Sequence, residues 1–550
     1  MSKIKVFALG GLNENGKNMY VVNVDEEIFI FDCGLKYDND INLGIDYIIP
    51  GHQFLIDNKD KIKGIFLSHG HESNMGATPD ILEAVHDIPV YGTHLTLEIL
   101  KNDMSNELIE KCNLIEIKPY NKIVFGNNSI FPISVTHSIP DAVCYVLYTP
   151  DGAIVYTGDY TFDSTMLGNY KCDIGKLAYV GKQGVLCLLS ESIYASKVGH
   201  TSPLDRAASL IREVLAHNEG RIICTVFPAH FYRIQELFDE IMKTHRNVIV
   251  MGKGLQNMIS ESLKEGYLTF DESRIKNLES LNEKGIIVFI SDEKERPFSN
   301  LNRIIKGYDK FIKLTDEDTV FITEPSYPGI EKKSSDVLDQ IAQIGANGIM
   351  LSNKKSLLHH ASSEDLMLMI NLMNPKYYFP VKGEYKDQYA NAEVAEACGM
   401  DKNNIILKLN GDVVEFDNGE MIESFEKVPV EQVLISGSSG DDIGDLVLKD
   451  REMLGNSGIV IISCTLDKDT KEIIGGPEIL TRGFVYVKES QELIEKTAEI
   501  ARNVILEDTK DSGKRVDYTR IKNDVRAELG NYFYQETEAK PMIITVIQEV

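Results

Sequence analysis

The 550-residue sequence lacks the features that mark membrane and secreted proteins. No stretch approaches the roughly 20 consecutive apolar residues that a membrane-spanning helix needs. The N-terminal residues run directly into a strand pattern, without a signal-peptide cleavage region. The eight cysteines are scattered, with no C-x-x-C pair, and most lie in apolar runs such as "GVLCLLS". We therefore expect a cytoplasmic protein with buried, reduced thiols and no membrane partner.

Positive charge is also scarce, because 57 lysines and arginines face 84 aspartates and glutamates, for a net charge of −27. Affinity for phosphates comes from lysine and arginine, so the charge alone argues against a nucleic-acid partner. It does not exclude a local basic groove, so a prediction of RNA binding has to rest on motifs. DNA is not an expected partner.

The chain is too long for one core, and the pattern of its predicted elements suggests several domains. Residues 1–198 alternate short strands with helical patterns, and residues 199–354 continue as a second α/β unit with its own parallel sheet. Residues 355–435 add a helix, a strand and a hairpin predicted at the Asn-Gly turn of "NNIILKLNGDVVEF". Residues 436–455 are predicted to be a Gly/Ser-rich acidic linker, and residues 456–550 a small α+β domain.

Histidine is scarce, at 12 residues, so its clusters stand out. His69 and His71 follow the strand "GIFL" in a turn that contains glycines. His137 follows an apolar strand, and Asp159 follows the strand of "AIVYTGDY". Potential ligands beside small residues at strand ends are typical of a site built on the rim of a sheet.

Several segments together resemble the bacterial ribonuclease J family. They are "GGLNENGKNMYVV", "DYIIP", "HGHESN", "THSIPDAV", "YTGDYTFD", "LLSES", "HHAS", "VKGEY" and "GGPEILTRGFVYV", and they run in family order. The resemblance implies a metallo-β-lactamase αββα sandwich, an inserted β-CASP α/β domain and a small α+β C-terminal domain that supports oligomers. It also implies a protein that matures and degrades RNA.

The resemblance implies two metal sites, of which the first is complete. Its ligands would be His69, His71, His137 and Asp159. Three imidazoles and one carboxylate suit zinc or manganese and leave a position for water. We therefore expect one divalent metal ion per chain, either Zn or Mn.

The second site has lost three of its four ligands, because Ser73, Asn74 and Lys382 stand beside the shared Asp159. A serine hydroxyl and an amide are weak neutral ligands, and a lysine cation repels a dication. We expect this site to be empty. The Lys382 ammonium would pair with Asp159 in place of the ion, and Ser73 and Asn74 would accept hydrogen bonds from it. The alternative is sequence drift, with Lys382 pointing to solvent.

The resemblance further assigns catalytic roles to His360, Glu191 and Asp159. Ser73 stands where the family has an aspartate that acts on the attacking water, and losing a positioned base costs roughly 10²–10⁴-fold in rate. The predicted RNA-binding residues are Ser356, Leu357, Leu358, His359, His360, Ala361, Ser362, Ala229 and His230. Several of these depart from the family pattern, which predicts a weaker grip on an RNA 5′ end.

Two functions remain open. The first is a weak one-metal ribonuclease that acts in rRNA and mRNA maturation and turnover, with low 5′–3′ exonuclease and residual endonuclease activity. The second is a non-catalytic RNA-binding scaffold subunit. Another metallo-β-lactamase hydrolase, such as a thioesterase or lactamase, is a distant third. The expected partners are RNA, further copies of the chain in a dimer or higher oligomer, an active paralogue and other RNA-degradation proteins.

Overall fold

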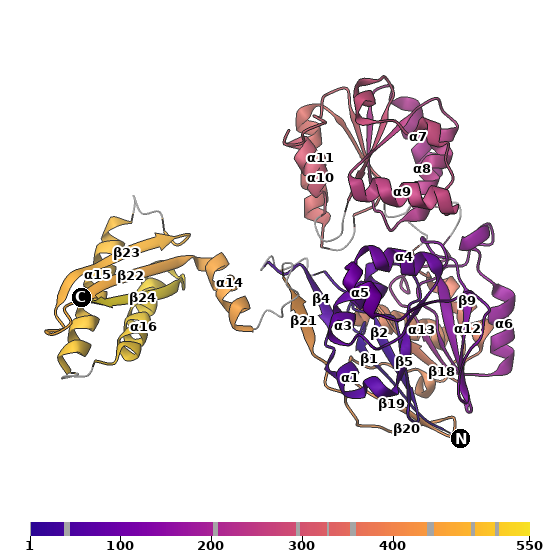
Figure 1. Cartoon of the computed structure of the whole chain (residues 1–550), viewed down its shortest axis with the longest axis horizontal. Helices are drawn as coiled ribbons and strands as arrows, with labels where there is room; N and C mark the ends of the chain where they lie inside the picture. Colours follow the sequence, from indigo (N-terminus) through magenta and orange to yellow (C-terminus); the bar gives the residue numbers. More distant parts are fainter. Residues whose placement is uncertain are drawn as a thin grey trace. The chain divides into compact units, whose positions relative to one another are not determined.

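The computed structural model divides the chain into two compact units (Figure 1). The first comprises Met1–Asp40 and Asp46–Gly440, and the second comprises Ile41–Ile45 and Asp441–Val550. The structure describes residues 2–37, 44–201, 207–292, 297–326, 329–352, 359–436, 445–485, 490–511 and 516–550.

Two sheets of the first unit pack face to face. The eight-stranded sheet has the order β20 (Glu420–Ile422), β19 (Val414–Asp417), β1 (Lys3–Gly10), β2 (Met19–Val24), β3 (Glu27–Phe31), β5 (Ile62–Phe66), β6 (Val90–Gly92) and β7 (Leu114–Glu116). The six-stranded sheet has the order β18 (Tyr377–Pro380), β12 (Val185–Ser190), β11 (Gly152–Tyr156), β10 (Val143–Thr149), β9 (Asn128–Ser134) and β8 (Ile123–Phe125). Aromatic side chains fill the space between them: the ring centroids of Phe31 and Tyr145 lie 5.9 Å apart, and those of Phe31 and Tyr156 5.6 Å. This core fixes the two sheets against each other.

Helices cover both outer faces of this sandwich. The apolar side of the eight-stranded sheet packs against α1 (Gln53–Asn58), α3 (Thr78–Ala84), α4 (His94–Asn102) and α5 (Asn106–Lys111). The six-stranded sheet packs against α6 (Ile174–Gln183), α12 (Ser363–Met373) and α13 (Tyr385–Ala397). The result is the four-layered αββα sandwich that the sequence predicted. A short pair of strands, β4 (Tyr47–Pro50) and β21 (Gln432–Ile435), lies outside the two large sheets.

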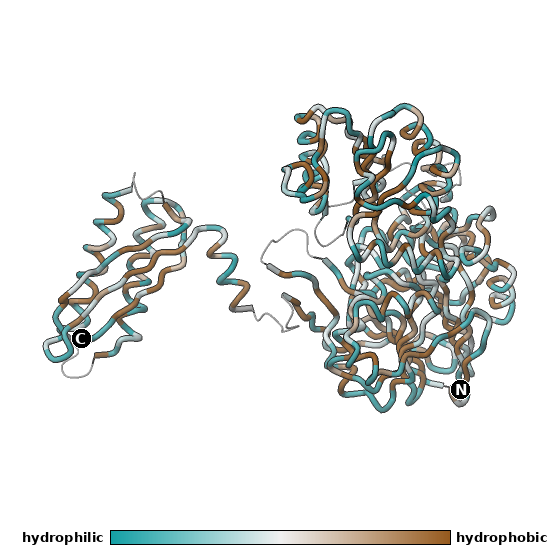
Figure 2. The backbone as a smooth tube through the Cα atoms, turned by 45° about the horizontal axis from the view of Figure 1, so that its top comes forward, coloured by the Kyte–Doolittle hydropathy of each residue, from teal (hydrophilic) through white to brown (hydrophobic). Residues whose placement is uncertain are grey.

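A second α/β sheet is inserted between β12 and β18, which themselves pair in parallel. All its strands are parallel, in the order β14 (Val248–Met251), β15 (Ile287–Ser291), β13 (Ile222–Val226), β16 (Thr319–Ile322) and β17 (Asn347–Met350). One face packs on α7 (Ala208–His217), α8 (Phe231–Met242) and α9 (Lys253–Glu265), and the other on α10 (Ser299–Ile305) and α11 (Glu331–Ile344). Apolar strands buried on both faces explain the continuous apolar runs of this segment (Figure 2).

The second unit is a three-stranded sheet with helices packed on one face. Its strands have the order β23 (Ile473–Arg482), β22 (Ile459–Leu466) and β24 (Met542–Glu549), and the helices are α15 (Gln491–Asp511) and α16 (Tyr518–Thr537). Successive side chains of a strand point to opposite faces of the sheet. The face that the two helices leave uncovered also carries apolar side chains. Ile461 pairs with Leu480 on one side and with Ile544 on the other, and Leu480 is 48% exposed. The sheet therefore presents an apolar row to solvent.

Two local predictions differ from the structure. Residues 445–455, predicted to be linker, form most of the helix α14 (Asp445–Ser457). The hairpin predicted at Asn410–Gly411 forms instead between β19 and β20, around Asn418 and Gly419, which both have positive φ. Gly411 is tied to the strand β1, because its amide donates to the carbonyl of Ala8 at 2.9 Å. Among the described helices, none has the length and apolar character needed to cross a membrane.

Candidate functional site

The predicted site residues meet at one edge of the sandwich because they follow strands that end there. Asp159, Glu191 and Lys382 come after β11, β12 and β18, which are neighbouring parallel strands of the six-stranded sheet. His69 and His71 come after β5 of the facing sheet. The carboxyl ends of parallel strands share an edge, which is where side chains from separate segments converge.

Two glycines allow the loops to approach closely enough. Gly158 has a φ of +60°, and a Cβ atom on it would lie 2.9 Å from the Cβ of Ser68. A Cβ on Gly70 would lie 2.8 Å from Cδ1 of Ile99. A larger residue at position 158 would push apart the turns that carry His69 and Asp159, and one at position 70 would push the His69–His71 turn away from Ile99.

The four predicted metal ligands form one buried group. Oδ2 of Asp159 lies 3.5 Å from Nε2 of His69 and 4.0 Å from Nε2 of His137, and Nδ1 of His71 lies 3.0 Å from Nε2 of His137. One ligand atom from each residue lies within 4.8 Å of the others.

The chemistry of this group fits a divalent ion. Within the described part of the chain, Oδ1 of Asp159 and Nδ1 of His137 are buried without a hydrogen-bond partner. Burial, together with the neighbouring His69 and His71, holds the pKa of His137 well below its usual range. Neutral imidazoles and an ionised carboxylate are the forms that bind metal.

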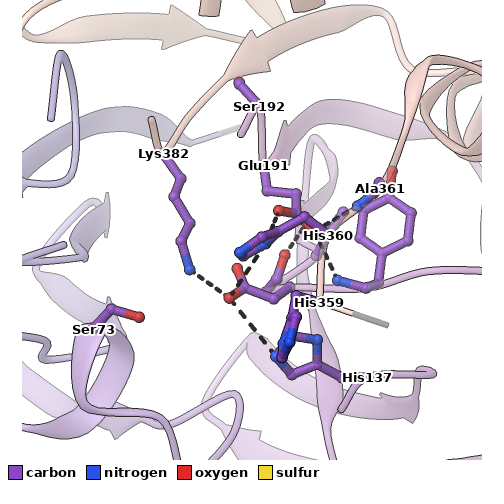
Figure 3. A network of polar contacts seen from close by, with 12 residues as sticks. Ser73, His137, Glu191, Ser192, His359, His360, Ala361 and Lys382 are labelled. Atoms are coloured by element: carbon purple, nitrogen blue, oxygen red, sulfur yellow. Dashed lines mark hydrogen bonds and ion pairs between the residues drawn. The ribbon is translucent and has the colours of Figure 1, made fainter. Parts of the chain in front are cut away.

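Lys382 occupies the other side of Asp159, as the sequence predicted (Figure 3). Its Nζ atom contacts Oδ2 of Asp159 and donates to Oδ1 of Asn74 at 3.1 Å, and the residue is only 2% exposed. Burial by itself would raise the pKa of Asp159, but Lys382, followed by His360 and His69, lowers this pKa to about 2. The alternative of a solvent-facing lysine does not describe this structure.

The backbone also holds Lys382 in place. Its φ is +59°, which is uncommon for a residue with a side chain, and its amide donates to the carbonyl of Gly11 at 3.0 Å. The next residue, Gly383, also has a positive φ and donates to the carbonyl of Glu14. The turn after β18 therefore aims the ammonium group into the site.

Asn74 connects Lys382 to a second buried carboxylate. Its amide nitrogen donates to Oδ2 of Asp32 at 2.7 Å, and Tyr156 donates to the same oxygen at 2.5 Å. Burial raises the pKa of Asp32 to about 6. Ser73 differs from the prediction, because its hydroxyl bonds to Asn74 instead of Lys382: it donates to Oδ1 of Asn74 at 2.7 Å. Of these two residues, Asn74 is the one that accepts from the lysine, alongside Asp159.

His360 and Glu191 form a short pair next to Asp159. Nδ1 of His360 lies 2.6 Å from Oε2 of Glu191 and 3.9 Å from Oδ2 of Asp159. Oε1 of Glu191 accepts from the backbone amides of Tyr160 and Ala361. Burial, and then the charge of Asp159, raises the pKa of Glu191 well above its usual range. The pair is therefore suited to hold a shared proton.

The predicted RNA-binding residues lie in different environments. Nε2 of His71 lies 3.3 Å from the carbonyl oxygen of Ala229, which brings His230 and then His359 to the same edge. Ala361 and Ser362 are buried, and Ser362 caps the N-terminus of the helix α12. Their side chains therefore pack inside the protein and do not face a ligand. Ser356, Leu357 and Leu358 lie outside the described residues.

Sequence reasoning missed Glu324, which is buried beside two of these histidines. It follows β16, and its Oε1 atom lies 2.9 Å from Nδ1 of His230. Burial alone would raise the pKa of Glu324, but His230, His359 and Arg233 hold it well below the usual range. The signal was available, because Glu324 ends an apolar strand just as Asp159 does.

Family models match four segments of the chain. They are the beta-lactamase superfamily domain over residues 30–181, the ribonuclease J beta-CASP domain over 219–341, the Zn-dependent metallo-hydrolase RNA specificity domain over 355–407 and the ribonuclease J C-terminal domain over 446–550.

Curated relatives match along the whole chain. The chain is 38% identical to "Ribonuclease J2" of Bacillus subtilis (strain 168), over 100% of this chain and 99% of that protein. It is 35% identical to "Ribonuclease J 2" of Staphylococcus saprophyticus, over 100% of this chain and 98% of that protein. It is 34% identical to "Ribonuclease J 2" of Staphylococcus aureus (strain NCTC 8325), over 100% of this chain and 98% of that protein.

A solved structure agrees at the level of the fold. A crystal structure of a protein of unknown function from Enterococcus faecalis V583 aligns with a TM-score of 0.52 and 16% identity. The alignment covers 76% of this chain and 100% of that one.

The first prediction concerns the buried pair of Lys382 and Asp159. Replacing Lys382 by methionine leaves the carboxylate buried without its cation, so we expect Lys382→Met to lower the free energy of unfolding of the metal-free protein by about 3–5 kcal/mol. Chemical denaturation monitored by circular dichroism measures this change. Lys386→Met is the matched control: its ion pair with Glu384 is exposed, so its expected effect is at most about 1 kcal/mol. Equal effects of the two substitutions would contradict the prediction.

Proposed function

The chain belongs to the ribonuclease J family, and on that premise we propose that it is a metal-dependent ribonuclease of low activity with one ion in the family's first metal site. The observation that carries the proposal is the contact between Lys382 and Asp159 beside a complete set of first-site ligands. Its substrates would be rRNA and mRNA during maturation and turnover.

His69, His71, His137 and Asp159 would hold this ion. When bound, the ion supplies Lewis-acid polarisation of a phosphate oxygen and lowers the pKa of bound water. Because Lys382 already neutralises the other side of Asp159, the position of a second ion is filled by a fixed positive charge.

His360 and Glu191 would supply the proton that the leaving oxygen of the RNA needs. The short bond from Nδ1 of His360 to Glu191 orients the ring, so its other nitrogen can serve the leaving oxygen of the RNA. Ser73 gives its hydroxyl to Asn74 and has no carboxylate with which to orient the attacking water. The expected activity is therefore weak, most of all for 5′–3′ exonuclease action, with endonuclease activity as the residual mode.

A second candidate function is a non-catalytic RNA-binding subunit that assembles with an active paralogue. The specific observation in its favour is the same Lys382–Asp159 pair, which keeps the second ion position closed. The exposed apolar row around Ile461 supports assembly into a dimer or higher oligomer, either of identical chains or with such a paralogue. Other RNA-degradation proteins are further candidate partners.

The second prediction tests the ion. We expect the purified protein to retain about one equivalent of Zn²⁺ or Mn²⁺ after dialysis against metal-free buffer, and His69→Ala to lose it. Mass spectrometric metal analysis provides the count. His94→Ala removes a histidine that is paired with Glu116 away from this set, so it should retain the ion. Retention of the ion by His69→Ala would refute the assignment.

The third prediction tests whether three positions act as one replacement. We expect the triple variant Ser73→Asp, Asn74→His, Lys382→His to bind one additional tight ion and to cleave a 5′-monophosphorylated RNA about 10²–10⁴-fold faster than the starting protein. Lys382→His alone should gain little, because Asn74 and Ser73 remain weak ligands. Rescue of both properties by the single substitution would contradict the idea of a coordinated replacement. If the triple variant binds the ion without cleaving RNA, the non-catalytic candidate is favoured.

The fourth prediction concerns assembly. A chain ending at Ser436 lacks Asp441–Val550, nearly all of the second unit, and we expect it to be monomeric in analytical ultracentrifugation. Leu480→Lys in the full chain places a charge in the exposed apolar row and should weaken assembly, whereas Glu528→Lys, at an exposed position of α16 on the opposite side of the sheet, is the matched control. A truncated chain that keeps the full oligomer would place the interface elsewhere.

A further inference from the structure

A second group of potential metal ligands lies next to the four-residue set. It consists of His230, Glu324 and His359, and one ligand atom from each lies within 4.8 Å of the others. None of the three belongs to either of the two metal sites that the family resemblance implies. They are brought together because β13 and β16 are parallel neighbours, so that His230 and Glu324 follow at the same edge of the inserted sheet.

Both oxygens of Glu324 face an imidazole. Oε1 lies 2.9 Å from Nδ1 of His230, and Oε2 lies 3.9 Å from Nε2 of His359. The second distance is too long for a hydrogen bond but is within reach of a shared ion. The ring centroids of His230 and His359 lie 4.5 Å apart, so two protonated rings would repel each other at this distance.

His359 is oriented by a neighbour that holds its other nitrogen. Nδ1 of His359 lies 2.9 Å from the hydroxyl oxygen of Ser138. A hydrogen bond at one ring nitrogen fixes the direction of the other, as it does for histidines that bind metals. It therefore directs Nε2 towards Glu324.

The positive charge nearby already has an acidic partner. Nε of Arg233 lies 3.6 Å from Oε1 of Glu324, but a terminal nitrogen of the same guanidinium contacts the buried Glu236. Glu324 is itself only 7% exposed. An arginine balanced by one glutamate leaves the charge of Glu324 to be balanced by the two imidazoles or by a cation.

We propose that His230, Glu324 and His359 bind a second divalent transition-metal ion, of which zinc is the best match. Two imidazoles and one carboxylate form a three-ligand set that leaves a coordination position open. The open position would take water or a phosphate oxygen of RNA. This site is independent of catalysis, and its three protein ligands make it weaker than the four-residue set.

The position of the site gives it a role in binding. The ring of His230 lies 5.7 Å from that of His71, and the ring of His359 lies 6.3 Å from that of His137. His359 thus lies on the histidine side of the site, away from Lys382 (Figure 3). An ion here would add a positive charge for phosphate at the edge of the inserted sheet.

Titration of the full-length, metal-free protein with Co²⁺ tests the proposal, because tetrahedral Co²⁺ with imidazole ligands absorbs visible light. We expect two equivalents to bind, the second more weakly. Glu324→Gln should weaken the second equivalent by more than about 100-fold and leave the first, since even groups that only orient a ligand contribute about 10–100-fold. Glu240→Gln is the matched control, because Glu240 is a buried carboxylate of the same sheet-and-helix region that binds Arg212.

The outcomes separate this site from the four-residue set. His69→Ala should lose the first equivalent and keep the one that depends on Glu324. If Glu324→Gln still binds two equivalents, or if the starting protein binds only one, the proposal is overturned. If Glu324→Gln loses an equivalent and His69→Ala loses none, this site stands and the assignment of the four-residue set fails. Should Glu324→Gln fail to fold by circular dichroism, His359→Ala, at a half-buried position, provides the same test.

Discussion

The buried ion pair between Lys382 and Asp159 determines how the rest of the site can work. A carboxylate that is 1% exposed is unstable as an anion unless positive charge is close to it, and in this chain the side chain of Lys382 supplies positive charge. Lysine is almost never fully buried without a partner, and here the backbone turn, Asn74 and Asp159 all act to keep it inside. A bound ion can be exchanged for another ion or removed, whereas the charge of a side chain stays in the site.

This constraint extends to the neighbouring residues. Asn74 accepts from Lys382 and donates to Asp32, so a residue at this position has to supply an acceptor and a donor in two directions at once. Ser73 in turn donates to Asn74 and fixes which way the amide faces. The three side chains and Oδ2 of Asp159 form one connected hydrogen-bond network. The effects of substitutions within such a network are not additive.

The sequence was sufficient to predict the sandwich, the inserted sheet and the meeting of Lys382 with Asp159. These features follow from strands that end in small or polar residues and from family motifs in the same order. The position of the hairpin could not be predicted, because Asn410–Gly411 and Asn418–Gly419 are equally good turns and tertiary contacts to β1 decide between them. Helix α14 was missed because glycine and acidic residues around it resemble a linker. Glu324 was missed because its histidine partners are distant in sequence.

The direct pairing of β12 with β18 has a consequence for synthesis of the chain. β12 ends at Ser190 and β18 begins at Tyr377, with the whole inserted sheet encoded between them. While the ribosome makes that insertion, the edge of β12 and the apolar surface that α12 and α13 will cover remain open. The inserted sheet consists of one contiguous segment, so it can fold before the sandwich is complete. The last strand of the six-stranded sheet to be made, β18, also delivers Lys382, so the ammonium reaches Asp159 only when this sheet is complete.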